Sequence, residues 1–178
     1  MPTVTIADPG LILLVGAAGA GKSLIARRNF TPDEVLSSDA MRATIAGDEA
    51  DQRASAAAFQ ILHREVELRL AAGRLTVVDA TNVRTTHRRP LLARAGAAGV
   101  AVAAIVVDLP PATVHARNAA RDRVVERAVV DRQLGWLRET VDRSVLEAEG
   151  IDPVVVLRSQ RDIDALRIVR AAAIPPPR

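Results

Sequence analysis

The sequence of 178 residues contains no cysteine, one lysine and only three aromatic side chains. Without cysteine there can be no disulfide framework and no thiolate zinc site. The histidines (His63, His87 and His115) are scattered and show no metal-ligand spacing. So few aromatic residues cannot form a surface that holds single-stranded nucleic acid by stacking one base after another. Any bound metal is therefore expected to be a hard cation on oxygen ligands.

A hydrophobic run long enough to cross a membrane is also missing. The longest stretch without polar side chains, Ala95 to Val107, has 13 residues, whereas a transmembrane helix needs roughly 18. The N-terminal residues lack the basic flank and apolar block of a secretory signal. We therefore expect a cytoplasmic protein with no membrane partner.

The remaining composition is that of one globular domain. Hydrophobic residues make up 49% of the chain and charged residues 25%, with a net charge of +3. These values exclude a disordered or fibrous chain and predict one compact core. The small net charge favours a polyanionic partner only mildly.

Short apolar runs alternate with longer helical segments along the chain. Strands are expected at 11–15, 35–37, 75–79, 100–108 and 154–157, and helices are expected to begin at Lys22, Asp39, Ala54, Thr85, Pro111, Glu126 and Ile163. This alternation predicts an α/β fold with a central parallel five-stranded sheet and helices on both of its faces. Ligands of such folds bind beyond the carboxyl ends of the strands, so functional residues are expected just after the strands.

The first expected strand is followed by the pattern G-x-x-x-x-G-K-[ST], here Gly16-Ala-Ala-Gly-Ala-Gly21-Lys22-Ser23, and then by an expected helix. In this pattern the glycines let successive N–H groups point at one phosphate, the lysine reaches the β and γ oxygens, and the serine binds magnesium. A tight strand-to-helix turn would explain the glycines but not the lysine, which is the only one in the chain. The segment therefore predicts a nucleotide-binding loop.

Two carboxylates follow the next expected strands. Asp39 starts a helix with Arg42 one turn on, which suits either a general base beside an arginine or a helix cap with a local salt bridge. Asp79 closes the strand before Thr81 and Asn82. An acid at this place supports magnesium or its waters, although it can also cap a turn.

An arginine pair, Arg117 and Arg121, has the spacing of one helix face, and neither residue has an acidic neighbour three or four positions away. Two like charges at this spacing repel each other mildly, so a bound phosphate between them would relieve the repulsion. Alternatively, the pair contacts a carboxylate elsewhere in the fold. With a bound phosphate, the segment that follows, up to Glu149, would belong to a lid that excludes water.

Taken together, five segments strongly resemble the polynucleotide 5′-kinase domain of bacterial polynucleotide kinase-phosphatases, a class of RNA-repair enzymes. They are the loop Gly16 to Ser23, the Ser37-Ser-Asp-x-x-Arg42 element, the acidic stretch around Asp48 to Gln52, the segment Val77 to Asn82, and Arg117-Asn-x-x-Arg121. The resemblance runs from about Leu11 to Leu166. It implies an adenylate-kinase-like P-loop fold with a helical lid at about residues 117–148.

The implied reaction is transfer of the γ-phosphate of ATP, with Mg²⁺, to the 5′-hydroxyl of a single-stranded RNA or DNA end. By this resemblance Asp39 is the general base, Arg42 contacts the acceptor, and Arg117 and Arg121 grip the ATP phosphates. The implied catalytic residues are Lys22, Asp39, Arg42 and Arg121. The implied nucleotide-binding residues are Gly16, Gly19, Gly21, Lys22, Ser23, Leu24, Arg117 and Arg121. The implied metal ligands are Ser23 and, through water, Asp79, and the loop Arg158 to Gln160 is expected to border the adenine.

In those repair enzymes phosphatase and ligase modules accompany the kinase. We therefore expect residues 1–170 to form the kinase domain, and the proline-rich residues 171–178 to start a linker to modules outside this chain. Two other functions share the same motifs: a small-metabolite P-loop kinase, and a nucleotide-dependent binding module that phosphorylates no acceptor. The choice between RNA and DNA depends on contacts to a single 2′-hydroxyl, which the sequence does not reveal.

Overall fold

The computed structural model describes residues 1–46 and 52–172. Its main sheet has five strands, all parallel, in the order β3-β4-β2-β5-β6. This confirms the predicted α/β class and the number of strands in the central sheet. The strands are β2 (Leu11–Val15), β3 (Val35–Ser37), β4 (Thr76–Asp79), β5 (Val102–Val107) and β6 (Val154–Leu157).

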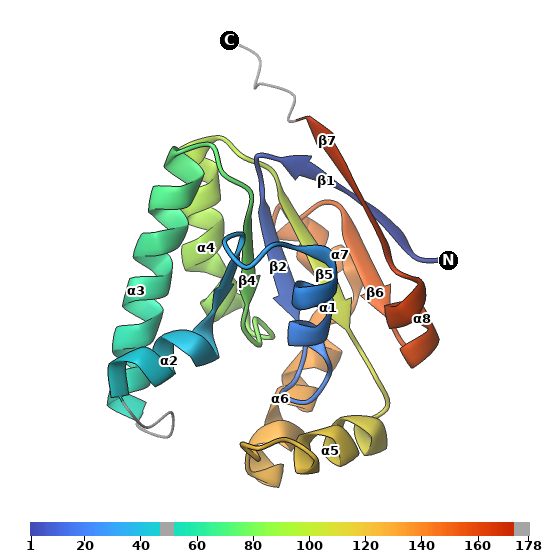
Figure 1. Cartoon of the computed structure of the whole chain (residues 1–178). Helices are drawn as coiled ribbons and strands as arrows, with labels where there is room; N and C mark the ends of the chain where they lie inside the picture. Colours follow the sequence, from blue (N-terminus) through green and yellow to red (C-terminus); the bar gives the residue numbers. More distant parts are fainter. Residues whose placement is uncertain (47–51, 173–178) are drawn as a thin grey trace.

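The helices connect and cover these strands (Figure 1). The helices are α1 (Lys22–Asn29), α2 (Ser38–Ala46), α3 (Gln52–Ala71), α4 (Thr85–Ala98), α5 (Pro111–Ala119), α6 (Arg127–Thr140), α7 (Arg143–Ala148) and α8 (Gln160–Ala165). Most begin within two residues of the predicted positions. Two differ: α7 is a separate helix because Asp142 caps it by accepting from Ser144 N–H at 3.0 Å, and α8 begins before Ile163 because Ser159 caps it.

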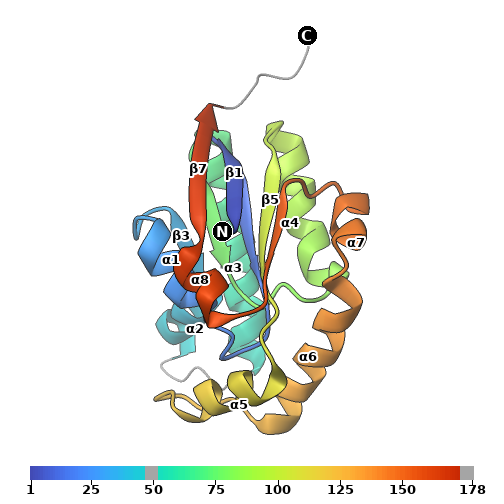
Figure 2. The ribbon, with the colours of Figure 1, turned by 90° about the vertical axis from the view of Figure 1, so that its right-hand side faces the viewer.

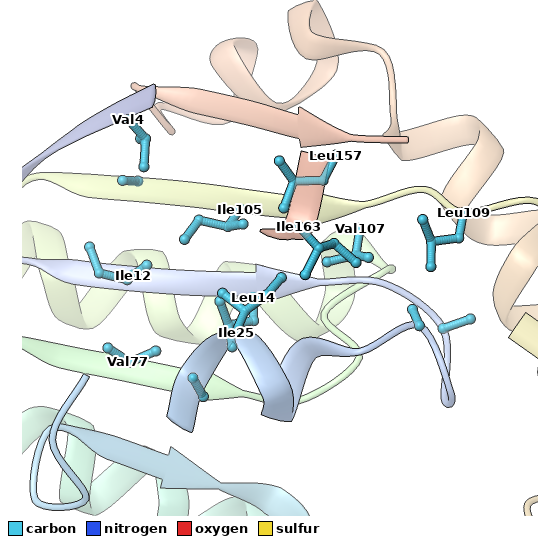
Figure 3. Close-up of a cluster of buried hydrophobic side chains, with 14 of the residues drawn as sticks. Val4, Ile12, Leu14, Ile25, Val77, Ile105, Val107, Leu109, Leu157 and Ile163 are labelled. Carbon is cyan, nitrogen blue, oxygen red and sulfur yellow. The ribbon is translucent and has the colours of Figure 1, made fainter. Parts of the chain in front are cut away.

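Alternate residues of the central strand β2 face opposite sides of the sheet. Ile12 and Leu14 pack in a cluster with Ile25 of α1, as Figure 3 shows. Leu11 and Leu13 pack in a second cluster with side chains of α3, α4 and α7. Burying each such side chain contributes roughly 1.5–3 kcal/mol. Apolar residues at every position of a strand are what a sheet covered on both faces requires.

A second sheet, which the sequence analysis did not predict, pairs the two ends of the described chain. Strands β1 (Thr3–Asp8) and β7 (Arg167–Ala172) run parallel and lie side by side (Figures 1 and 2). The alternation of β1 is visible in the sequence, with Val4 and Ile6 buried and Thr3 and Thr5 exposed. The mostly exposed β7 carries almost no such signal, and its partner is more than 150 positions away.

Two expectations concern residues that lie partly outside the described chain, and a third concerns the described helices. The predicted proline-rich tail begins inside β7, which includes residues 171 and 172, and residues 173–178 lie outside the described part. The acidic stretch from Asp48 to residue 51 also lies outside it. Within the described helices, none is both long and apolar enough to span a lipid bilayer.

The carboxyl ends of the strands meet at one edge of the main sheet, where Leu14 is in register with Asp79 and Val15 with Val106. Helices α5 and α6 lie beyond this edge in both views (Figures 1 and 2). The fold therefore gathers the loop after β2, the start of α2, the end of β4 and α5 to α6 around one place.

Candidate active site

A cavity of about 750 Å³ lies at this edge of the sheet. Its walls come from the glycine-rich loop and α1, the start of α2, one side chain of α3, the end of β4, and α5, α6 and α8. The lining includes Ala18, Gly19, Gly21, Lys22, Ser23, Arg27, Asp39, Arg42, Phe59, Asp79, His87, Arg117, Arg121, Arg123, Gln133 and Gln160. The predicted base Asp39, the predicted metal residue Asp79 and the predicted catalytic cations Lys22, Arg42 and Arg121 thus meet in one cavity.

The glycine-rich loop is shaped by backbone that other residues rarely adopt. Gly19 has a φ of 83°, and a Cβ there would stand 2.7 Å from the carbonyl oxygen of Val114 in α5. Gly21, with a φ of 107°, directly precedes α1. The loop can therefore pack against α5 and turn into α1 only with glycine at these positions.

Backbone donors of this loop are left without partners. In the described parts of the chain, the N–H groups of Gly19, Gly21, Lys22 and Ser23 make no hydrogen bond. N–H groups at the start of a helix that remain unpaired form a ready site for an anion. This arrangement is what the sequence pattern predicts for a phosphate-binding loop.

Lys22 is buried, and its Nζ donates to the carbonyl oxygens of Gly16 and Ala17, both at 2.9 Å. Burial is the largest influence on its charge, opposed by the Asp79 carboxylate and reinforced by Arg121, and together they lower the pKa of Lys22 to about 8. The ammonium group is therefore held at the start of the loop in surroundings that disfavour its positive charge. A phosphate bound there would stabilise that charge.

Asp79 ends β4 and is buried. Its carboxylate makes no hydrogen bond or ion pair with any of the residues that the structure describes. It lines the cavity together with Ser23. A buried carboxylate and a hydroxyl on one wall are the hard oxygen donors that Mg²⁺ takes, with water completing its shell. These two residues fit the predicted magnesium site, although no cluster of three or more metal-ligating side chains occurs among the described residues.

The loop after β4 is fastened to the glycine-rich loop. The N–H of Gly16 donates to the carbonyl of Thr81 at 2.9 Å, and the buried Asn82 side chain donates to the carbonyl of Leu14 at 2.9 Å. Asn82 has a φ of 48°, a conformation that asparagine tolerates better than most residues. These bonds fix the position of the end of β4, and so of Asp79, relative to the glycine-rich loop and Lys22.

A completely buried arginine, Arg88 of α4, supports that loop from behind. Its guanidinium donates to the carbonyl of Asn82 at 2.8 Å and to both carboxylate oxygens of Glu149 at 2.7 and 2.5 Å. Burial raises the pKa of Glu149, but the hydrogen bonds from Arg88 and Thr85 outweigh it and lower that pKa. The sequence analysis did not find this pair, because its members are 61 positions apart.

Asp39 lies at the start of α2, and 46% of its side chain is exposed. It forms an ion pair with Arg42 on the next turn, as the local alternative predicted, and a second one with Arg121, whose Nη2 lies 3.7 Å from Oδ2. Arg121 thus contacts a carboxylate elsewhere in the fold, and that carboxylate belongs to the same cavity. The cap at the start of α2 is Ser37, whose Oγ accepts from the N–H of Ala40 at 3.3 Å, and Asp39 lines the cavity, where a base would have to lie.

Arg117 reaches the glycine-rich loop from α5. Its Nη1 donates to the carbonyl of Ala20 at 3.2 Å, and its Nη2 to the side-chain oxygen of Gln160 in α8. The neighbouring Asn118 is buried and bonds the backbone of Val125 twice, at 2.7 and 3.1 Å. This fixes the turn that carries Arg121 and Arg123.

Three further cavity residues escaped the sequence analysis. Gln133 of α6 accepts from the N–H of Ala18 at 2.8 Å. Phe59 and His87 form another wall, with ring centroids 6.2 Å apart. Burial, reinforced by Arg84 and Arg88, lowers the pKa of His87. Gln133 carries a sequence signal, since it lies within the stripe of Val130, Leu134 and Leu137, the buried positions of α6.

The parallel sheet, the glycine-rich loop with its unpaired N–H groups, and the cations around it define a P-loop nucleotide-binding domain with the fold of P-loop kinases. Residues 11–140 match a family of proteins described as an AAA domain, and the chain belongs to that family. No curated protein matches the sequence.

Solved structures share this fold at low sequence identity. A chain of the Pnkp1/Rnl/Hen1 RNA repair complex has a TM-score of 0.64 and 20% identity, over 77% of this chain and 46% of that one. A gluconokinase from Sinorhizobium meliloti 1021 has a TM-score of 0.55 and 18% identity, over 89% of this chain and 87% of its own. The APS kinase CysC of Mycobacterium tuberculosis has a TM-score of 0.54 and 17% identity, over 89% of this chain and 93% of its own. The chain spans about half the length of the RNA-repair protein that it matches.

Proposed function

We propose that this protein is an ATP-dependent polynucleotide 5′-hydroxyl kinase, which transfers the γ-phosphate of ATP to the 5′-hydroxyl of an RNA or DNA end. The segments that resemble bacterial polynucleotide kinase-phosphatases support this proposal, as does the likeness to a chain of an RNA repair complex. Phosphatase and ligase modules in a longer protein would follow from the same proposal.

The positive charge of the cavity is the observation that favours a polynucleotide as the acceptor. Among the residues that the structure describes, six cationic side chains and two carboxylates line it: Lys22, Arg27, Arg42, Arg117, Arg121 and Arg123, with Asp39 and Asp79. A bound triphosphate would pair with the cations next to the glycine-rich loop. Further arginines on the side of Asp39 suit an acceptor that brings its own phosphodiester charges, because guanidinium groups bind phosphate oxygens in pairs.

Asp39 would serve as the general base in this reaction. Its half-exposed carboxylate can accept the proton of the 5′-hydroxyl while the 5′ oxygen forms its bond to the γ-phosphorus and the bond from that phosphorus to ADP breaks. Arg42 and Arg121 hold the carboxylate in place by ion pairs. Arg121 also stands where it can stabilise charge on the transferring phosphoryl group.

Lys22, the unpaired N–H groups of the loop and Arg117 would hold the nucleotide phosphates. Ser23 and Asp79 would hold Mg²⁺, Asp79 through water. When bound, Mg²⁺ would neutralise charge on the phosphate oxygens. If residues 117–148 close over the nucleotide as a lid, they also keep water from the reacting phosphate.

A small-metabolite kinase is the second candidate. The gluconokinase and the APS kinase match this chain over nearly their whole length, and this likeness supports an enzyme that acts on a small alcohol. The same loop, base and arginines would serve it, and only the acceptor differs.

The deciding experiment measures transfer of labelled γ-phosphate from MgATP to a short single-stranded oligonucleotide. One sample carries a 5′-hydroxyl, a matched one a 5′-phosphate, and a third reaction contains the free nucleoside. Label on the 5′-hydroxyl oligonucleotide alone supports the proposal. Equal labelling of the nucleoside favours the small-metabolite kinase, and no labelling while ATP still binds contradicts both kinase proposals for these acceptors.

A further inference from the structure

Gln133 is a polar residue on the buried side of α6, between Val130 and Leu134. Its side chain crosses from α6 to the glycine-rich loop, 115 positions earlier, and accepts the N–H of Ala18 at 2.8 Å. Because that N–H is a donor, the carboxamide must present its oxygen to it, and this turns the NH₂ group away from Ala18. In the described parts of the chain this NH₂ group has no hydrogen-bond partner.

The contact between Gln133 and Ala18 lies at the end of the loop that would meet the γ-phosphate. Nζ of Lys22 reaches the carbonyls of Gly16 and Ala17, the two residues immediately before Ala18. In a phosphate-binding loop the lysine reaches the β and γ phosphates, so Ala18 belongs to the γ end. Gln133 lines the cavity together with Ala18 and Lys22.

We propose that Gln133 recognises the terminal phosphate of a bound nucleoside triphosphate. The carboxamide oxygen holds Ala18, and the NH₂ group donates to an oxygen of the γ-phosphate. This makes Gln133 a residue that distinguishes a triphosphate from a diphosphate and links α6 to the nucleotide. The inference rests on the proposed nucleotide binding but not on the identity of the acceptor.

The chemistry of the site favours this role over that of a simple tether. A carboxylate at position 133 would also accept from Ala18, but it would repel a triphosphate. An apolar side chain would leave the Ala18 N–H without its partner. Glutamine both accepts from the loop and offers a neutral donor, which suits a place already crowded with the charges of Lys22, Arg117 and Arg121.

The test measures binding of a non-hydrolysable ATP analogue and of ADP by calorimetry, with magnesium, in the wild type, Gln133→Ala and Gln133→Glu. Gln133→Ala is expected to weaken the analogue roughly 10-fold and ADP by less than about 2-fold, as loss of one hydrogen bond to a charged group predicts. Gln133→Glu keeps the contact to Ala18 and is expected to weaken the analogue at least as much. Gln60→Glu, the same change at an exposed position of α3, is expected to alter neither affinity.

Thermal unfolding of each variant verifies that it folds. If Gln133→Ala loosens the loop, Gln133→Glu still tests the inference, because it keeps a side chain of the same size. Equal losses for the analogue and ADP would show that Gln133 only shapes the loop, and unchanged affinities would show that it contacts no phosphate. Either result overturns the inference. If the wild type binds neither nucleotide, the inference fails together with the nucleotide site. If the analogue loss is selective but no oligonucleotide is phosphorylated, only the proposed acceptor is wrong.

Discussion

Asp39, the proposed general base, has a half-exposed carboxylate that two arginines hold in place. Substitution Asp39→Ala is expected to lower phosphoryl transfer by roughly 100-fold or more, as the loss of a positioned base does, while ATP affinity is retained. Transfer rates and ATP binding are measured in parallel. Asp152→Ala, at an exposed position where β6 begins at the opposite edge of the sheet, is the matched control.

The same pair of measurements separates an enzyme from a nucleotide-dependent binding module. Lys22→Ala is expected to abolish ATP binding, whereas Asp39→Ala is not. A module that only binds ATP would lose partner binding with Lys22→Ala and keep it with Asp39→Ala. Loss of ATP affinity of similar size in both variants would contradict the separate roles given to the two residues.

Lys22 gives the site a pH dependence of known direction. Its pKa is lowered to about 8 in the folded protein, below the unfolded value near 10.4. Between these two values the unfolded chain binds more protons, so the free energy of unfolding from this group rises with pH across that window. Below about pH 8 the full cost of burying the ammonium is present.

Binding of nucleotide phosphates favours the charged form of Lys22, so ATP affinity is expected to fall as the pH rises past about 8. Because Lys22 is the only lysine in the chain, ¹³C-labelled lysine reports on it without ambiguity in an NMR titration. A midpoint near 8 without nucleotide, shifted upward with ADP, is expected. A midpoint near 10.4 in both states would be inconsistent with the buried position of the ammonium.

The loop after β4 depends on an ion pair between helix α4 and Glu149, the residue that follows α7. Arg88 is completely buried, and its partner Glu149 is only 14% exposed. Substitution Arg88→Met removes the cation, so that the Glu149 carboxylate keeps only its hydrogen bond from Thr85 and the Asn82 carbonyl loses the donor Arg88. We expect the free energy of unfolding to fall by about 3–5 kcal/mol, measured by urea denaturation.

The control for this prediction is Arg143→Met. Arg143 pairs with Glu147 at 2.7 Å, but both side chains are more than 40% exposed. Exposed pairs of this kind contribute about 0.3–0.5 kcal/mol. If the two substitutions had the same small effect, the buried pair would not hold the loop.

At the level of the complete fold, β1 and β7 close the molecule on the side away from the cavity. Arg170 of β7 donates to both carboxylate oxygens of Glu34 at 2.7 and 3.0 Å, and its guanidinium lies 5.9 Å from the ring centroid of Phe30. Residues 1–8 and 167–172 therefore anchor each other and the start of β3.

Removal of β7 by truncation after Leu166 is expected to destabilise the fold by a few kcal/mol, at about 0.5–1.5 kcal/mol for each backbone hydrogen bond lost. Nucleotide affinity, measured at a temperature where the truncated chain remains folded, is expected to be unchanged, because no residue of β7 lines the cavity. A loss of affinity without a loss of stability would mean that β7 influences the site.

Local patterns in the sequence were enough to predict the central sheet and the phosphate-binding loop. The apolar runs of β2 and β5 and the spacing of Gly16, Gly21 and Lys22 depend on backbone geometry within one or two turns of chain, so they can be read directly. The meeting of Lys22, Asp39 and Asp79 followed from one rule, that parallel strands end at the same edge, whereas the role expected of Arg121 came from its spacing to Arg117 and from the resemblance. Their separate roles in catalysis remain predictions.

The tertiary structure alone decided which distant side chains meet. The contact of Gln133 with Ala18 joins positions 115 apart, the pair of Arg88 and Glu149 joins positions 61 apart, and β1 pairs with the far end of the chain. Nothing in the neighbourhood of either partner specifies the other. Such contacts arise because helices must cover both faces of the sheet, and the packing that buries their apolar sides determines where the few polar side chains among them come to lie.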